Sequence, residues 1–168
     1  MVIETARLSI RLPRAEDAAA YHAMHSDPDV TRWLGGPMPG SVEGEAERIA
    51  RNRTMHEEIG FTIWAVEEKE TGEVVGVAGV VRVENVGPEI EVAYHFRKDR
   101  WGRGYATEAA RACLDYGFET AGLDRIIGLV APENVASARV LEKCGMTREG
   151  TAHHYDMDLL KYAIDRAE

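Results

Sequence analysis

The feature that most constrains this chain is a short glycine-rich turn between an extended segment and a helical one. Its residues are Trp101, Gly102, Arg103, Gly104, Tyr105, Ala106 and Thr107. The two glycines allow a tight bend with positive φ, and they carry no Cβ that would block an approaching group. The helix that follows leaves its first N–H groups without intrahelical partners, and its positive dipole end favours anions. Because Arg103 adds a basic side chain, we predict that the turn cradles phosphates.

Two familiar phosphate motifs do not match this turn. The chain lacks the P-loop pattern G-x-x-x-x-G-K-S/T. Thr107 stands where the dinucleotide fingerprint G-x-G-x-x-G requires its third glycine. The turn alone is also compatible with an ordinary connection between a strand and a helix, so the rest of the chain must decide.

Periodicity and turn residues predict alternating strands and helices along the chain. We expect strands at 8–12, 61–67, 73–83, 89–96, 126–130, 146–153 and 156–164, and helices at 15–26, 29–34, 41–58, 105–121 and 134–144. Segment 89–130 has the length of a β-α-β crossover, and its last strand is wholly apolar, as a buried parallel strand would be. We therefore predict one α/β domain over residues 1–168, with a mixed sheet of about seven strands and helices on both faces.

Composition excludes several other classes of protein. The net charge of −9 argues against a nucleic-acid-binding protein, which needs a basic stripe. No apolar run approaches the ~18 residues of a membrane span, and the N-terminus lacks a secretory signal, so we expect a cytoplasmic protein. Cys113 and Cys144 have no metal-binding spacing, and His153 and His154 lack a third ligand, so no metal site is predicted.

Three further motifs accompany the turn, within residues 4–30, 71–76 and 134–146. The first reads E-T-A-R-L-S-I-R followed by E-D and S-D-P-D-V, the second T-G-E-V-V-G, and the third N-V-A-S-A-R-V-L-E-K-C-G-M. Gly104 and Ala106 match the last fixed positions of a pyrophosphate loop written Q/R-x-x-G-x-G/A. Together these motifs resemble the Gcn5-related N-acetyltransferase (GNAT) family. Trp101 departs from the first position of the loop pattern, but the sequence W-G-R-G-Y-A-T-E-A that begins there resembles the branch of ribosomal-protein alanine and serine N-acetyltransferases (RimJ/RimL type).

The resemblance implies that the cofactor is acetyl-CoA. The backbone of the turn would hold the pyrophosphate, and Asn134 would bond the pantetheine arm, although Asn is also a common helix N-cap. Strand 89–96 would diverge from strand 126–130, so that the pantetheine amides complete the sheet and a backbone N–H stabilises the thioester oxyanion. The predicted cofactor-binding residues are Tyr94, His95, Phe96, Trp101, Gly102, Arg103, Gly104, Tyr105, Ala106, Thr107, Asn134 and Ser137. The side chains of Tyr94 and Phe96 are expected in the core.

Amine acetylation requires removal of the amine proton and protonation of the departing thiolate. Many family members supply the second proton from a Tyr, but the matching position here is Leu141. Ser137 is the candidate that the branch suggests, with packing beside the cofactor as its alternative. For the base, strand alternation places Glu91 and His95 on one face, and His95 has the better intrinsic pKa. The favoured alternatives are structural, namely a satisfied carboxylate for Glu91 and a packed ring for His95, and proximity alone carries part of such reactions.

We therefore predict direct acetyl transfer to a primary amine. A protein N-terminus of the ribosomal type is favoured, and a small-molecule amine is the enzymatic alternative. A non-catalytic acyl-CoA-binding module is the other alternative, which the absence of a Tyr at Leu141 leaves open. The loop 33–40 and segment 153–155 are expected to form the rims of the acceptor pocket. An exposed sheet edge is compatible with a homodimer.

Overall fold

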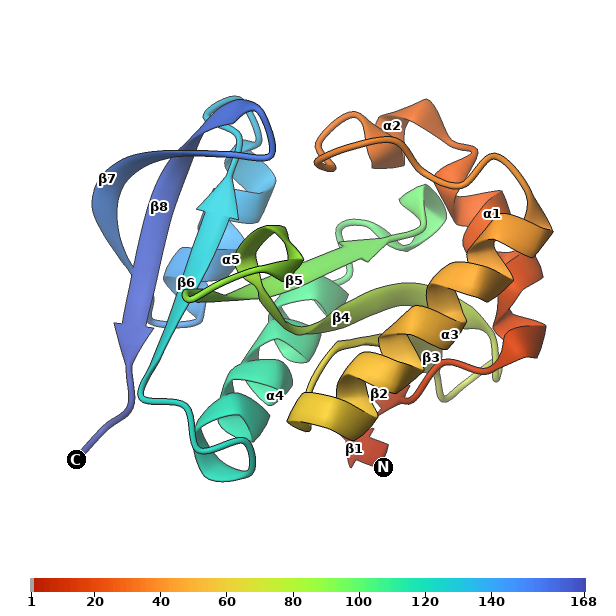
Figure 1. The fold of residues 1–168 in the computed structure, drawn as a ribbon, viewed down its shortest axis with the longest axis horizontal. Coiled ribbons are helices and arrows are strands. Elements are labelled where there is room, and N and C mark those ends of the chain that lie inside the picture. Colours follow the sequence, from red (N-terminus) through yellow and green to blue (C-terminus); the bar gives the residue numbers. More distant parts are fainter. Residues whose placement is uncertain (1) are drawn as a thin grey trace.

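A computed structural model describes residues 2–168, and its strands form one eight-stranded mixed sheet (Figure 1). The strands are β1 (Val2–Glu4), β2 (Leu8–Arg11), β3 (Ile63–Glu68), β4 (Val74–Arg82), β5 (Ile90–Phe96), β6 (Arg125–Val130), β7 (Thr147–His154) and β8 (Met157–Asp165). Their order across the sheet is β1-β2-β3-β4-β5-β6-β8-β7. Only β5 and β6 pair in parallel, and all other neighbours are antiparallel.

Helices cover both faces of the sheet. They are α1 (Ala18–His25), α2 (Pro28–Thr31), α3 (Val42–Ile59), α4 (Tyr105–Glu119) and α5 (Val135–Lys143), with 3₁₀ turns η1 (Ala15–Asp17), η2 (Val83–Asn85) and η3 (Lys98–Arg100). On one face, Tyr21 of α1 and Ile49 of α3 pack in a cluster with Val77. Val80 points to the other face, where it packs in a second cluster with Ala109 of α4. In residues 2–168 no helix is long and apolar enough to cross a membrane.

The predicted α/β fold class and the mixed sheet with helices on both faces are confirmed, with one strand more than expected. The missed strand is β1, which spans only Val2–Glu4, lies at the edge of the sheet and is largely exposed. Three residues at an open edge carry too little hydrophobic alternation to be recognised in a sequence. The crossover predicted at 89–130 is present as β5, α4 and β6.

The helices begin and end at residues whose side chains or backbone angles stop a helix. Ser41 caps α3, since its Oγ accepts a hydrogen bond from the N–H of Gly44 at 3.0 Å. Gly60 ends the same helix with a φ of 84°, a conformation that favours glycine. Asn134 caps α5 in the same way, because its Oδ1 accepts from the N–H of Ser137 at 3.3 Å.

The sheet opens between its two parallel strands. β5 and β6 share a single register pair, Glu91 with Ile127. In Figure 1, β6 then turns away from β5 and continues beside β8. On its other side, β5 stays paired with β4 over its whole length, from Ile90 to Phe96. Most of one edge of β5 therefore lacks a strand neighbour, as the family resemblance implied.

Candidate active site

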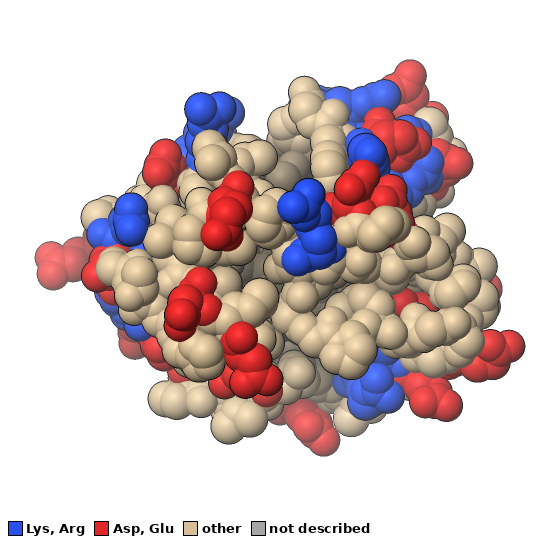
Figure 2. All heavy atoms as spheres, turned by 90° about the horizontal axis from the view of Figure 1, so that it is seen from above, with Lys and Arg blue, Asp and Glu red and all other residues tan. Residues whose placement is uncertain are grey.

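A large cavity lies where β5 and β6 separate. Its volume is about 1470 Å³, and β5, α3, the loop before α3 and the first turns of α4 and α5 contribute to its lining. Figure 2 shows the surface hollowed between the half of the molecule that holds β6 to β8 and the half that holds α1 and α3. The predicted site residues that line the cavity are Glu91, Tyr94, His95, Phe96, Trp101, Gly102, Gly104, Tyr105, Ala106, Thr107, Asn134 and Ser137. The structure thus brings together every predicted site residue except Arg103.

The glycine turn has the geometry that its sequence predicts. Gly102 and Gly104 have φ angles of 73° and 81°, and Gly104 is the N-cap of α4. The first hydrogen bond of that helix joins the N–H of Glu108 to the carbonyl of Gly104 at 3.1 Å. The N–H groups of residues 105–107 therefore have no partner within the helix, and these residues line the cavity. Such a helix end provides donors and a positive dipole for an anion.

Side chains from distant segments hold the turn in place. The Nε1–H of Trp101 donates to the carbonyl of Phe96 at 2.9 Å. Arg7 donates through Nη1 to the carbonyl of Arg103 at 2.8 Å, and its Nη2 forms an ion pair with Glu108 at 2.7 Å. Both carbonyls are thereby satisfied, which leaves the backbone N–H groups of the turn as its free donors.

The Arg103 side chain does not enter the cavity. It is about half exposed, and its Nη1 lies 3.8 Å from the buried carboxylate of Glu68. Glu68 also accepts hydrogen bonds from the Tyr105 hydroxyl at 2.7 Å and from Arg100 Nε at 3.0 Å. These bonds, with Tyr105 contributing most, lower the pKa of Glu68 to about 2. The basic side chain that the sequence suggested for phosphate therefore lies beside a structural carboxylate under the turn.

The backbone of β5 shows which residues present donors and acceptors to the opening. The N–H of Arg97 donates to the carbonyl of Val75 at 2.8 Å, and the register between β4 and β5 is unbroken. Because backbone groups alternate along a strand, the odd-numbered residues of β5 pair with β4. Tyr94 therefore directs its N–H and carbonyl toward the opening, as Phe96 does with its N–H while its carbonyl accepts from Trp101, whereas the backbone groups of His95 belong to the ladder with β4. His95 can reach the site only through its side chain.

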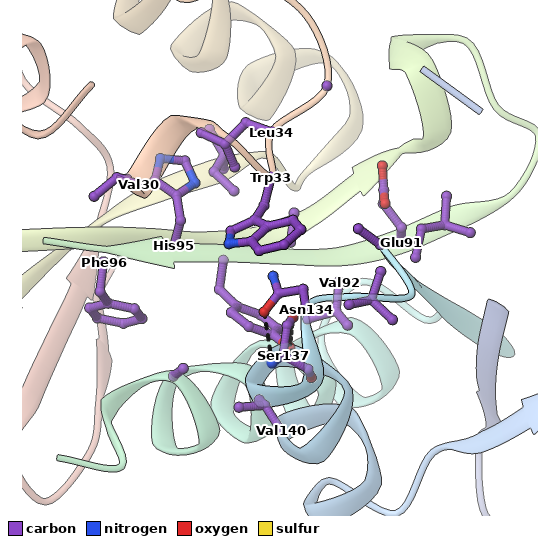
Figure 3. Close-up of a pocket in the computed structure, with 18 of the residues that line it drawn as sticks. Val30, Trp33, Leu34, Glu91, Val92, His95, Phe96, Asn134, Ser137 and Val140 are labelled. Carbon is purple, nitrogen blue, oxygen red and sulfur yellow. Dashed lines mark hydrogen bonds between the residues drawn. The ribbon is translucent and has the colours of Figure 1, made fainter. Parts of the chain in front are cut away.

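Ser137 and Asn134 lie together at the first turn of α5 (Figure 3), and the side chain of Tyr94 reaches them from β5. The Tyr94 hydroxyl donates to the Ser137 carbonyl at 3.1 Å and lies 3.1 Å from Ser137 Oγ. Burial raises the pKa of Tyr94, so the phenol keeps its proton. Sequence reasoning assigned Tyr94 to the core and missed this contact, because nothing in the sequence places a strand residue beside a helix 43 positions later.

Leu141 fills the position where many family members have a Tyr. It is fully buried, and its methyl groups lie against Gly128, where an added Cβ would stand 2.8 Å away. The residue therefore packs in the core between α5 and β6, and the described residues offer no hydroxyl at this place.

Comparison with known proteins identifies the family. A family model described as an acetyltransferase (GNAT) domain matches residues 7–147. The chain belongs to the GNAT acetyltransferase family. The uncharacterised protein YkkB of Bacillus subtilis is 35% identical over 161 residues, covering 94% of this chain and 92% of that protein. The uncharacterised N-acetyltransferase YoaA of the same organism is 31% identical and covers 92% and 87%. A GNAT acetyltransferase of Bacillus anthracis has the same fold, with a TM-score of 0.82, 31% identity and 98% coverage of both chains.

These relatives show that the protein is an acetyltransferase enzyme, and the family uses acetyl-CoA as its acetyl donor. The structure fits that donor, because the free edge of Tyr94 and the free N–H groups of the glycine turn lie in one cavity. The sequence-based alternative of a non-catalytic binding module loses its support. The specific ribosomal branch is not established by these relatives.

Glu91 is the first candidate base of this GNAT enzyme. Its side chain points to the opposite side of β5 from Val92 (Figure 3), and the Tyr155 hydroxyl donates a hydrogen bond to its Oε1. Burial raises the pKa of Glu91 to about 7. Tyr155 lies in the turn between β7 and β8 and packs on the backbone of Gly35, in the loop before α3. The two predicted rims of the acceptor pocket therefore meet above Glu91.

The paired histidines beside Tyr155 do not line the cavity. They belong to β7, and their Nδ1 atoms lie 2.8 Å from an Asp158 oxygen for His153 and 3.4 Å from a Glu84 oxygen for His154. Of the rim predicted over residues 153–155, Tyr155 is therefore the residue that lines the cavity. Within residues 2–168 no group of three or more His, Cys, Asp or Glu side chains is arranged to bind a metal ion.

His95, the second candidate base, is the cavity end of a chain of buried polar side chains. Its Nε2 lies 2.8 Å from His25 Nε2, and His25 Nδ1 lies 2.6 Å from Glu45 Oε1. Burial lowers the pKa of both histidines, so both rings are neutral near neutral pH. The sequence did not predict this series of hydrogen-bonded side chains, because Glu45, His25 and His95 lie on three separate elements, α3, α1 and β5. The available signal was a His and a Glu on helix faces that also carry apolar residues.

The face of α3 that borders the cavity is basic. Arg48, Arg51, Asn52 and Met55 all line the cavity from this helix. Among the described residues neither arginine pairs with a carboxylate; Arg48 Nη1 contacts the sulfur of Met38 at 3.1 Å. The Asn52 amide nitrogen is buried without a hydrogen-bond partner. This surface therefore offers hydrogen-bond donors that the protein itself leaves unused.

Proposed function

We propose that this GNAT enzyme transfers an acetyl group from acetyl-CoA directly to a primary amine in the same cavity, and that the acceptor is a protein N-terminus of the ribosomal type. The open edge of β5 is the observation that carries the proposal. Tyr94 and Phe96 present backbone groups there, between the free N–H groups of the turn and the first turn of α5. A pantetheine arm carries amides that can pair with such an edge as an added strand would.

The residues divide the work along the cavity. The N–H groups of residues 105–107 would hold the pyrophosphate, and Asn134, whose Oδ1 is used by the helix cap, would offer its amide N–H to the pantetheine arm. Each charge-assisted hydrogen bond from a backbone N–H to the pyrophosphate contributes roughly 1.5–3 kcal/mol. The cofactor supplies the activated thioester. The protein must orient it and move two protons.

The Ser137 and Tyr94 hydroxyls form a candidate pair for protonating the departing thiolate. A serine hydroxyl is a poor acid on its own, but the neutral Tyr94 hydroxyl lies within hydrogen-bond distance of Ser137 Oγ and can donate a hydrogen bond that stabilises this oxygen as it gives up its proton. This pair takes the role for which Leu141 has no hydroxyl. On the other side of β5, Glu91 and His95 are the candidates for accepting the amine proton.

The ribosomal acceptor is supported by the sequence around Trp101. A ribosomal L7/L12 N-acetyltransferase, RimL, has the same fold in its complex with coenzyme A, with a TM-score of 0.79 and 17% identity. At that identity the likeness concerns the fold alone. A cytoplasmic location and a homodimer stay predictions from the sequence.

An acetyl-transfer screen with free-thiol detection tests the proposal. We expect turnover with peptides that begin with Ala or Ser, and none with the same peptides blocked at the N-terminus. The blocked peptides are the matched control for thioester hydrolysis, which also releases thiol. Transfer to small amines but to no peptide would overturn the ribosomal acceptor. If acetyl-CoA binds but no amine is acetylated, the proposed transfer itself is wrong.

A small amine that carries an acidic group is the second candidate acceptor. The unpaired guanidiniums of Arg48 and Arg51 favour a carboxylate or phosphate on the acceptor. Small-molecule acceptors occur among the relatives, since the spermidine N(1)-acetyltransferase of Escherichia coli is 30% identical over 148 residues, covering 88% of this chain and 76% of that protein. Spermidine itself carries only positive charge, which the two arginines disfavour. Comparing an amino acid with its amide, in the wild type and Arg48→Met, separates the two kinds of acceptor.

A further inference from the structure

Three polar residues, of which Glu45 and His25 are buried and His95 is half-buried, connect the cavity to the interior of the face that α1 and α3 cover. Glu45 of α3 has 0% exposure, and His25 of α1 has 7%. His95 completes the chain, with 2.6 Å between Glu45 and His25 and 2.8 Å between the two rings. Figure 3 shows the His95 ring on the opposite side of β5 from Phe96, above the strand, toward Val30 and Leu34. Within residues 2–168 the Glu45 carboxylate has a single hydrogen-bond partner, the ring of His25. Burying a carboxylate with so few partners lowers the stability of the fold, and a functional role for the ring would explain why it is present.

With Glu45 as a carboxylate, the two contacts allow one arrangement of protons on the two rings. A carboxylate only accepts, so His25 must donate from Nδ1 to Glu45, which leaves its Nε2 as an acceptor. His95 must then donate from Nε2 to His25, and its Nδ1 is left with a lone pair. Within residues 2–168 His95 Nδ1 forms no hydrogen bond, and because this nitrogen is not fully buried it is accessible from the cavity that His95 lines.

We propose that His95 accepts the proton of the acceptor amine through Nδ1, and that His25 and Glu45 are positioning residues that hold it in the required tautomer. The proposal rests on the proposed acetyl transfer. The amine N–H bond breaks as the Nδ1–H bond of His95 forms. The Nε2 proton of His95 then passes to His25 Nε2, and the positive charge comes to lie on His25 beside the Glu45 carboxylate. No further reactant is needed, and the proton returns to solvent when product leaves.

The surroundings favour this direction of proton movement. Glu45 Oε2 is buried without a partner, so the carboxylate has unused capacity to stabilise a charged His25. The other polar groups close to the chain are Tyr21 and His22 on α1 and Arg48 on α3. Arg48 disfavours a cation on either ring, but only His25 has the Glu45 carboxylate beside it to offset that effect. Glu91, the other acidic group on this face of β5, lies four residues away, or ~13 Å along the strand.

Substitutions of Glu45 and His25, the two members of the Glu45–His25–His95 series that do not line the cavity, test the proposal. Glu45→Gln keeps the shape but can donate to His25 Nδ1, which reverses both tautomers. We expect kcat to fall ~100-fold or more, with the affinity for acetyl-CoA in calorimetry and the unfolding free energy close to wild type. His25→Asn should have a similar effect. His22→Asn on α1 and Glu47→Gln on α3 are matched controls, because neither residue belongs to the hydrogen-bonded series of Glu45, His25 and His95. We expect both variants to retain wild-type kcat.

Two readouts separate a proton relay from a merely structural role. Nitrogen NMR of the histidines should show wild-type His95 protonated at Nε2 and free at Nδ1, and the reverse in Glu45→Gln. The pH profile of kcat/KM should lose its acidic limb, the fall in activity as the base becomes protonated, in Glu45→Gln and keep it in the controls. A proton on Nδ1 of wild-type His95, or unchanged kcat in Glu45→Gln and His25→Asn, overturns the relay. If the wild type itself acetylates no amine, the proposed function fails, and the NMR result still decides the tautomers.

Discussion

Replacing Glu91 with Gln should stabilise the folded protein at alkaline pH and leave its stability in acid nearly unchanged. The Glu91 side chain is almost completely buried, and its hydrogen bond comes from the neutral hydroxyl of Tyr155. Burial therefore penalises the carboxylate form, and it raises the pKa from the ordinary 4.5 to about 7. Gln keeps the size and an acceptor oxygen for Tyr155 but carries no charge.

The size of the effect follows from the two pKa values. The folded protein binds the Glu91 proton more tightly than the unfolded chain does, so the stabilising contribution is complete below about pH 4.5. It is lost as the pH rises through about 7, because above that value the folded protein must hold a buried charge. The difference between 4.5 and about 7 corresponds to ~3 kcal/mol. Gln abolishes this dependence, so the variant should gain ~3 kcal/mol relative to wild type between acid and alkaline pH.

Urea unfolding of the two proteins at a series of pH values measures this difference directly. Other titrating groups act alike in both proteins and cancel when the free energies are subtracted. Glu57→Gln, which removes an exposed carboxylate from α3, is the matched control, and its effect should stay within about 0.5 kcal/mol at every pH. A difference between wild type and Glu91→Gln that does not change with pH would refute the argument that burial, and not the Tyr155 bond, dominates the pKa of Glu91.

Further expectations concern the cofactor site and the core. Gly104→Val places a β-branched residue at a φ of 81°, and it should weaken acetyl-CoA binding in calorimetry by about tenfold or more; unchanged affinity would contradict the phosphate assignment. Ser137→Ala and Tyr94→Phe should each lower kcat with little change in cofactor affinity, and wild-type turnover in both would make the pair structural. Leu141→Ala should cost ~2–5 kcal/mol of stability in urea unfolding, and a cost below ~1 kcal/mol would show that the residue is not packed as described.

The sequence was most informative where function depends on the backbone. Gly102 and Gly104 required positive φ, and both have it. The strand before the turn and the helix after it were predicted from local periodicity, and the parallel neighbour β6 from its wholly apolar composition. These features depend on residues close together in the chain, so local rules suffice. The same rules correctly placed Glu91 and His95 on one face of β5, because the ladder with β4 contains no bulge.

Side-chain partners across the fold were beyond such reasoning. A phosphate contact of Arg103 stays a prediction, and local patterns could not show that its guanidinium would lie 3.8 Å from the buried Glu68 at the end of β3. Tyr94 packs against the core as predicted, but local patterns could not show that α5 brings Ser137 to its hydroxyl. In each case the contacting residue belongs to another strand or helix. The position of the side-chain tip can be known only from how that element packs. Periodicity assigns a residue to a face of a strand or helix and carries no information about what packs on that face.

The two candidate bases differ in how their reactive atoms are placed. Glu91 lies where β5 still pairs with β6, and Tyr155 occupies one of its oxygens. His95 lies beyond that pair, beside the free edge of Tyr94 where a pantetheine arm would run, and its Nδ1 is unoccupied. An acceptor amine must meet the thioester along that free edge, so His95 is the better placed of the two. Glu91→Gln should therefore change stability more than turnover, and His95→Asn should change turnover more than stability.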